Sequence, residues 1–165
     1  MNAKTFFLFA TALLALPFAS CSDDDDNAVE TVTISSLEGE FVGEATGTMV
    51  IISQTGEESS SDVTPQGTET ATITVDAEKS TITLTQPTFY VGNGVYPGAI
   101  VRDIPAVLAD GVVTFSINDY GSMNGYYTVA GDLSGTNKDK LLTLDYTFKH
   151  AGQMVGTIHF EGKRK

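Results

Sequence analysis

Residues that commonly carry chemistry are scarce in this sequence of 165 amino acids. It has no tryptophan, one cysteine and two histidines. One cysteine excludes a disulfide within the chain. His150 and His159 are the only histidines that could activate a serine or threonine or bind zinc. No calcium-loop pattern of the type Asp-x-Asp-x-Asp-Gly occurs. We therefore predict no catalytic residue, no metal site and no cofactor, and we do not expect an enzyme.

Basic residues are also few, which limits the possible partners. Nine lysines and arginines stand against 21 acidic residues, giving a net charge of −12. Removing residues 1–20 takes away Lys4 alone, and residues 21–30 carry five acidic groups, so the remaining domain has a charge of −8. A domain this acidic is repelled by phosphate backbones. We therefore expect no nucleic-acid partner.

An apolar run occupies the N-terminus. Phe6–Phe18, 13 residues long, follows the positively charged Lys4. As a helix this run would be roughly 20 Å long. The hydrocarbon core of a bilayer is about 30 Å thick. The run therefore fits the hydrophobic region of a signal peptide better than a membrane-spanning helix.

Cys21 directly follows two small residues, Ala19 and Ser20, of the kind that a signal peptidase requires. This arrangement resembles the signal of bacterial lipoproteins, with Phe18 where such signals usually have leucine. We predict that residues 1–20 are removed and that Cys21 is lipidated, so that the membrane is a partner through this anchor. The alternative is an ordinary secretory signal cleaved near Ala19.

An acidic run follows the cysteine: Asp23, Asp24, Asp25 and Asp26. Like charges in a block repel one another and stay extended, so the run can serve as a plain spacer. It also resembles the surface-export signal of Bacteroidetes lipoproteins, which implies an outer-membrane protein facing the cell exterior. A periplasm-facing orientation is the alternative. We assign residues 21–36 to the lipidated cysteine and tether, and residues 37–165 to one folded domain.

Within this domain apolar residues alternate with threonine or serine, as in Val113-Thr-Phe-Ser-Ile117. A period of two is typical of strands with one buried face. Asp110-Gly111 and Asn124-Gly125 are tight-hairpin dipeptides. Polar loops are expected at 57–64 and 134–139. We predict eight strands, at about 39–52, 66–76, 80–91, 97–107, 112–118, 125–133, 140–149 and 153–163.

Eight antiparallel strands in sequence order predict an all-β fold, an eight-stranded up-and-down β-barrel whose closure removes exposed edges. A β-sandwich of the same strands is the alternative. The first strand favours the barrel, because Gly43, Ala45 and Gly47 share one face, and small inward residues let a strand coil sharply. The predicted inward positions are Phe41, Met49, Ile51, Ile73, Ile82, Leu84, Phe115, Leu144, Phe148 and Phe160.

The order and spacing of several short motifs resemble the calycin-like β-barrel lipoproteins of Bacteroidetes, relatives in fold of lipocalins. The motifs are Phe41-Val-Gly43, Phe89-Tyr-Val-Gly92, Tyr96-Pro-Gly-Ala-Ile-Val-Arg-Asp-Ile104, Val129-Ala-Gly-Asp-Leu133, Leu141-Leu-Thr-Leu144 and Val155-Gly-Thr-Ile-His-Phe-Glu-Gly162. The resemblance covers about residues 37–163. It implies the barrel fold and the cell envelope, without implying an activity. The Gly-x-Trp signature of lipocalins is absent.

Aromatic residues gather around two predicted turns: Phe89, Tyr90, Tyr96, Tyr120, Tyr126 and Tyr127. At a barrel mouth such side chains can stack on sugars or cover an apolar pocket, and they can equally pack the rim and plug the end. Two function classes follow. One is a surface binding module for a small apolar or glycan-derived ligand. The other is a structural or interaction lipoprotein with a plugged barrel, accessory to an envelope complex.

The two histidines are expected to lie apart. With Ala151-Gly152 as a hairpin turn, paired residues have numbers that sum to about 303. His159 then lies opposite Leu144 and points to solvent, while His150 lies at the solvated turn. A metal site shared by the two histidines is therefore not expected.

Overall fold

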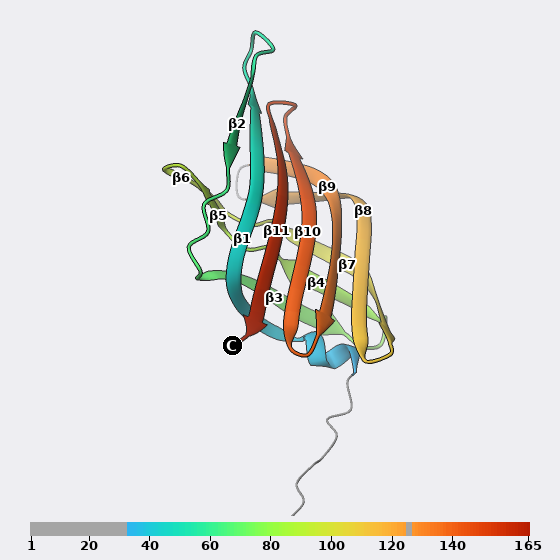
Figure 1. The fold of residues 1–165 in the computed structure, drawn as a ribbon. Helices are drawn as coiled ribbons and strands as arrows, with labels where there is room; N and C mark the ends of the chain where they lie inside the picture. Colours follow the sequence, from blue (N-terminus) through green and yellow to red (C-terminus); the bar gives the residue numbers. More distant parts are fainter. Residues whose placement is uncertain (1–32, 125–126) are drawn as a thin grey trace, which may run out of the picture. The chain divides into compact units, whose positions relative to one another are not determined.

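Segments of alternating polarity form strands in the computed structural model, which describes residues 33–124 and 127–165 (Figure 1). The elements are the 3-10 helix η1 (Ile34–Leu37) and the strands β1 (Gly39–Ile52), β2 (Glu58–Asp62), β3 (Glu69–Asp76), β4 (Thr81–Thr85), β5 (Phe89–Val91), β6 (Gly94–Tyr96), β7 (Ile100–Ala109), β8 (Val112–Asn124), β9 (Tyr127–Lys138), β10 (Leu141–His150) and β11 (Met154–Arg164). The predictions for the signal peptide, Cys21 and the aspartates at 23–26 lie outside the described residues. In the described part, no helix combines the length and apolarity needed to cross a bilayer.

Eight of these strands close into a barrel. Their order is β1, β3, β4, β7, β8, β9, β10 and β11, and β11 pairs again with β1. The closing ladder runs from Phe41 opposite Arg164 to Ile51 opposite Met154. All neighbouring pairs in the barrel are antiparallel. The predicted up-and-down barrel is therefore confirmed, and the sandwich is excluded because the first and last strands are hydrogen-bonded.

The inward face of the barrel is filled by large apolar side chains. Of the ten positions predicted to point inward, nine are buried: Phe41, Met49, Ile73, Ile82, Leu84, Phe115, Leu144, Phe148 and Phe160. The prediction was wrong for Ile51, whose exposed fraction is 40%. Ile51 lies where β1 pairs with β2 and no longer with β3, so there is no opposite wall to cover it.

Two phenylalanine rings lie over glycines of the neighbouring strand. Phe115 of β8 is paired with Gly135 of β9, and Phe148 of β10 is paired with Gly156 of β11. A Cβ atom at either glycine would overlap the ring beside it. A ring over a cross-strand glycine fills space that would otherwise be empty and helps to fix the strand register.

Two glycines of β1 lie close to the backbone of β11. Gly47 has φ +133°, and a Cβ there would overlap the carbonyl oxygen of Thr157 in β11. A Cβ at Gly43 would overlap the carbonyl oxygen of Glu161, which also lies in β11. These glycines thus permit a close approach between the two strands that close the barrel.

Several predicted boundaries were wrong. The strand expected at 112–118 continues as β8 to Asn124. The expected loop at 57–64 contains β2, a polar strand that pairs only with the end of β1. The expected loop at 134–139 contains the end of β9, which continues to Lys138 between β8 and β10. The predicted strand at 80–91 is two strands, because β4 ends at Thr85 and β5 belongs to a separate hairpin with β6.

Of two predicted hairpin turns, one was predicted correctly and the other with the wrong length. Asp110 and Gly111 have φ of 51° and 74°, as a two-residue hairpin turn of the predicted kind requires. The turn between β10 and β11 has three residues, because His150 pairs with Met154. Paired residues therefore have numbers that sum to 304, and His159 lies opposite Asp145 instead of Leu144.

The two ends of the barrel differ. The 3-10 helix η1 packs against β3 and β7 and buries Leu37 completely, which covers one end (Figure 1). Arg164 and Lys165 lie at this covered end, where the Arg164 guanidinium donates to the carbonyl oxygen of Glu38. The opposite end carries the turn between β10 and β11. We call this opposite end the mouth.

Candidate functional site: a cavity at the barrel mouth

A cavity of about 370 Å³, called here the mouth cavity, lies at the mouth of the barrel. One wall comes from the β5–β6 hairpin and the segment after it, and the other from the ends of β9, β10 and β11. The residues that line it are Gln86, Phe89, Gly94, Val95, Tyr96, Pro97, Ala99, Val129, Phe148, His150 and Met154. Its size and mainly apolar lining are those of a small-molecule site.

Aromatic stacking holds the hairpin against the barrel. The rings of Phe89 and Tyr96 stack with their centroids 5.4 Å apart and their planes at 11°. Phe89 also contacts Phe148 of β10, again with 5.4 Å between the centroids. Such pairs stabilise by about 0.5–1.5 kcal/mol beyond the burial of their area. Phe89 therefore joins the hairpin to the barrel wall, and Tyr96 covers it from the other side.

A buried amide forms part of the lining. Gln86 follows β4 and is 4% exposed. Its Oε1 accepts from the backbone N–H of Ala99 at 3.3 Å, and its Nε2 donates to Tyr120 Oη at 3.0 Å. Tyr120 Oη in turn donates to the carbonyl oxygen of Thr147 at 2.9 Å. Because the N–H of Ala99 can only donate, this network fixes which end of the amide is oxygen.

Two buried tyrosines add polarity to the barrel interior. Burial raises the pKa of Tyr120, and burial raises the pKa of Tyr146 far more. Tyr146 is 3% exposed and its hydroxyl has no hydrogen-bond partner among the described residues. Both phenols therefore stay uncharged at neutral pH, and Tyr120 acts as a hydrogen-bonding group rather than as a base.

The structure brings together only some of the aromatic residues predicted for the site. Phe89 and Tyr96 line the mouth cavity. Tyr120 lies behind the cavity as the partner of Gln86, and Tyr90 is half-buried outside the lining. Tyr126 and the side chain of Tyr127 lie outside the described part of the chain.

Several lining residues were missed by the sequence analysis: Gln86, Val129, Phe148, His150 and Met154. A usable signal existed for Gln86, because Ile82 and Leu84 point inward and the period of two continues to position 86. A glutamine in this inward series is a polar residue at a core position. No comparable sequence signal marks Val129 or Met154, whose positions depend on how far each strand reaches towards the mouth.

The two histidines lie in different surroundings, as predicted, although neither is where the predicted register placed it. His150 lines the mouth cavity, and its Nδ1 donates to the carbonyl oxygen of Thr128 at 3.0 Å. His159 is on the outer face, where its Nδ1 lies 2.7 Å from Asp145 Oδ1. This hydrogen bond raises the pKa of His159, with a smaller contribution from Glu161. The described residues contain no group of three or more side chains suited to hold a metal.

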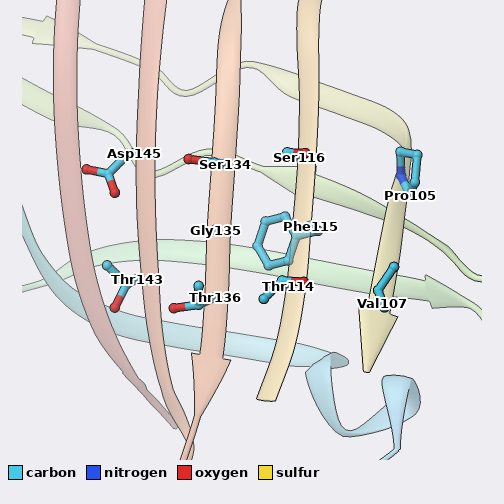
Figure 2. A pocket seen from close by; sticks show the side chains of 10 residues that line it. All are labelled: Pro105, Val107, Thr114, Phe115, Ser116, Ser134, Gly135, Thr136, Thr143 and Asp145. Atoms are coloured by element: carbon cyan, nitrogen blue, oxygen red, sulfur yellow. The ribbon is translucent and has the colours of Figure 1, made fainter. Parts of the chain in front are cut away.

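A second hollow, the outer groove, lies on the outside of β7, β8, β9 and β10 (Figure 2). It measures about 450 Å³ and is larger than the mouth cavity. Half of its ten lining residues carry hydroxyl side chains on neighbouring strands: Thr114, Ser116, Ser134, Thr136 and Thr143. Its polar side chains belong to the outward faces of the strands and are solvated. The buried amide therefore makes the mouth cavity the better candidate site.

Comparisons with known proteins support the fold. No protein-family model matches the chain, and no curated protein is similar enough in sequence to count as a relative. A candidate outer membrane protein of Bacteroides fragilis has a similar structure, with a TM-score of 0.53 and 22% identity over 79% of this chain. This chain spans 52% of that protein. Transferrin binding protein B of Neisseria meningitidis gives a TM-score of 0.42 at 17% identity, over 77% of this chain and 25% of that one. At these identities the first similarity shows a shared barrel fold.

Proposed function

We propose that this protein is a calycin-like barrel lipoprotein of the bacterial outer membrane, anchored through Cys21 and facing the cell exterior. We further propose that its mouth cavity binds a small apolar or glycan-derived ligand, without catalysis. The signal pattern before Cys21 and the acidic run after it support the location. The shared fold with a candidate outer membrane protein of Bacteroides fragilis agrees with it.

The mouth cavity carries the binding proposal. It combines about 370 Å³ of space, apolar walls and a buried amide at one end of a closed barrel. Ligand sites in proteins commonly pair an apolar lining with a few placed polar groups. A barrel whose mouth is filled by packed side chains would not combine this space, these apolar walls and a buried amide.

The second candidate is a structural or interaction lipoprotein, accessory to an envelope complex. The packing of the covered half of the barrel favours it, because the large side chains of Phe41, Leu144 and Phe160 are completely buried there. On this proposal the mouth cavity has no specific occupant, and the outer surface makes the functional contacts.

Native mass spectrometry of protein purified from its own host separates these two candidates. A co-purifying small molecule is expected with the wild-type chain and should be lost in Val129→Trp, which fills the mouth cavity. Val107→Trp is the matched control, because Val107 lines the outer groove and is 59% exposed. Retention of the molecule in Val129→Trp, or its absence throughout, would favour the structural role.

Fractionation and protease shaving of intact cells test the location. Cys21→Ser should release the protein from the membrane fraction, since a multiply acylated cysteine anchors firmly and the unmodified chain has no equivalent. Replacing the four aspartates at 23–26 with alanine should keep the protein membrane-bound but protect it from shaving. Four glutamates at the same positions are the charge-matched control and should leave it accessible. Membrane retention of Cys21→Ser after a high-salt wash would contradict the anchor.

A further inference from the structure

We propose that the mouth cavity selects uncharged molecules, each with an apolar body of about a dozen non-hydrogen atoms and an end group that both donates and accepts a hydrogen bond, such as a primary amide. This inference rests on the proposed binding function and narrows its ligand class. It places the end group of the ligand on Gln86.

The walls argue for an uncharged ligand. No carboxylate, lysine or arginine occurs among the described residues that line the mouth cavity. The one basic side chain in the lining is His150, whose Nδ1 already donates to the carbonyl oxygen of Thr128. A carboxylate bound there would lose water without gaining a lysine or arginine as an ionic partner, which is costly. The net charge of −8 on the domain adds a weak repulsion of anions. An uncharged end group avoids both penalties.

Gln86 argues for a group that donates and accepts. A side-chain amide offers two N–H donors and two acceptor lone pairs. Tyr120 takes one donor and the N–H of Ala99 takes one lone pair. One N–H and one lone pair remain on an amide that is held in place and borders the cavity. A primary amide on the ligand has the complementary donor and acceptor in one plane.

The aromatic and aliphatic walls argue for an apolar body. Phe89, Val129 and Phe148 are all less than 10% exposed in the absence of a ligand, and they face the same space. A sugar ring would have to leave several hydroxyl groups against these walls without partners, which is costly. Since a water molecule occupies about 30 Å³ of liquid, 370 Å³ corresponds to about twelve non-hydrogen atoms.

Decanamide and decanoate form a matched pair of that size, because each has twelve non-hydrogen atoms and they differ in the charge of the end group. The experiment uses the mature chain with Cys21→Ser, so that no detergent competes. The neutral dye N,N-dimethyl-1-naphthylamine, which has about the same number of non-hydrogen atoms as the two compounds, reports the occupied cavity by fluorescence at pH 8, and each compound is titrated as a competitor. We expect decanamide to displace the dye at concentrations at least tenfold lower than decanoate.

The variant Gln86→Met removes the hydrogen bonds at nearly constant volume. It should lower the affinity for decanamide roughly five- to tenfold, which is the effect of losing about one hydrogen bond, and leave the affinity for the dye unchanged. Gln66→Met is the matched control, since Gln66 is exposed on the loop before β3 and lies outside the cavity. Retained dye binding by Gln86→Met also shows that this variant is folded.

The outcomes distinguish the inference from the proposal beneath it. If the dye does not bind the wild-type chain, and neither compound binds by calorimetry, the cavity is not a ligand site and the proposed function fails. If the dye binds but decanoate competes as well as decanamide, the inference is overturned and the proposed function stands. Equal decanamide affinity in wild type and Gln86→Met overturns the role of Gln86. Displacement of the dye by N-acetylglucosamine at similar concentration would instead indicate a glycan-derived ligand.

Discussion

Replacing Gly47 by alanine tests how closely β1 approaches β11. Two costs add at this position. The φ of +133° belongs to a region that L-residues rarely adopt, which costs roughly 1–3 kcal/mol. The new Cβ also overlaps the carbonyl oxygen of Thr157, so the closing ladder must shift, and overpacking of this kind costs roughly 1–3 kcal/mol. We expect Gly47→Ala to lower the free energy of unfolding by about 2–6 kcal/mol.

Two other glycines separate these costs. Gly111 has φ +74°, and no atom lies within 4 Å of the point that an alanine Cβ would occupy, so Gly111→Ala should show the backbone cost alone, about 1 kcal/mol. Gly121 has no positive φ and also has open space. Gly121→Ala should therefore be neutral or stabilise by about 0.4–1 kcal/mol, because alanine restricts the unfolded chain.

Urea melts of the three variants decide the question. A domain of this size has about 5–15 kcal/mol of stability, so the expected loss at Gly47 is a large fraction of the total. The expected order of unfolding midpoints, from highest to lowest, is Gly121→Ala, then Gly111→Ala, then Gly47→Ala. If Gly47→Ala melts with Gly121→Ala, then β1 and β11 are not as close as described, and the geometry of barrel closure would have to be revised.

Two further predictions concern polar contacts elsewhere in the barrel. Glu69 is 3% exposed and accepts from the backbone N–H groups of Gln66 at 2.8 Å and Thr68 at 2.9 Å. In urea melts, Glu69→Ala should lower the free energy of unfolding by about 2–4 kcal/mol, because both donors lose their acceptor. Glu69→Gln should lower it by about half as much. His159→Gln should cost less than about 1 kcal/mol, since the contact with Asp145 is exposed. The pKa of His159 is raised in the folded state, so this stabilisation is complete below the unfolded value of 6.5 and disappears as the pH rises through the folded value. Melts at pH 5.5 and pH 8.5 should therefore differ more for wild type than for His159→Gln, and equal differences would contradict the ion pair.

The barrel was predictable because its walls have one buried face. Alternation in segments such as Val113–Ile117 reports this burial directly, and Asp110-Gly111 reports the turn between two walls. The strand β2 gave no such signal. All five of its residues, Glu58–Asp62, are exposed on both faces, so an apolar–polar pattern had no physical reason to arise.

Glycine explains another error. The segment 134–139 was predicted as a loop because Gly135, Thr136 and Asn137 are common in loops. In the barrel the ring of Phe115 covers Gly135, so the apolar group at this inward position comes from the neighbouring strand. A single sequence does not reveal that one residue supplies the side chain for another position.

The candidate site was predictable only in part. Phe89 and Tyr96 were found because aromatic residues near turns stand out, but their stacking depends on a short hairpin that was assigned to a longer strand. Gln86 was overlooked although its position in the inward series of β4 could have indicated it. The one-residue error opposite His159 came from Gln153, the third residue of a turn whose dipeptide Ala151-Gly152 predicted two.

Closure between β1 and β11 has a consequence for how the chain folds. Phe41 pairs with Arg164 and Ile51 pairs with Met154, so this ladder joins residues 103 to 123 positions apart in the sequence. The chain loses conformational entropy when so long a loop closes, and only then do the contacts of the ladder form and offset this loss. Proteins rich in such long-range contacts fold in milliseconds to seconds. No closed barrel can form until β11 has emerged. If the chain crosses a membrane as its signal predicts, it stays translocation-competent until almost all of it has passed, without any need for the barrel to be unfolded again.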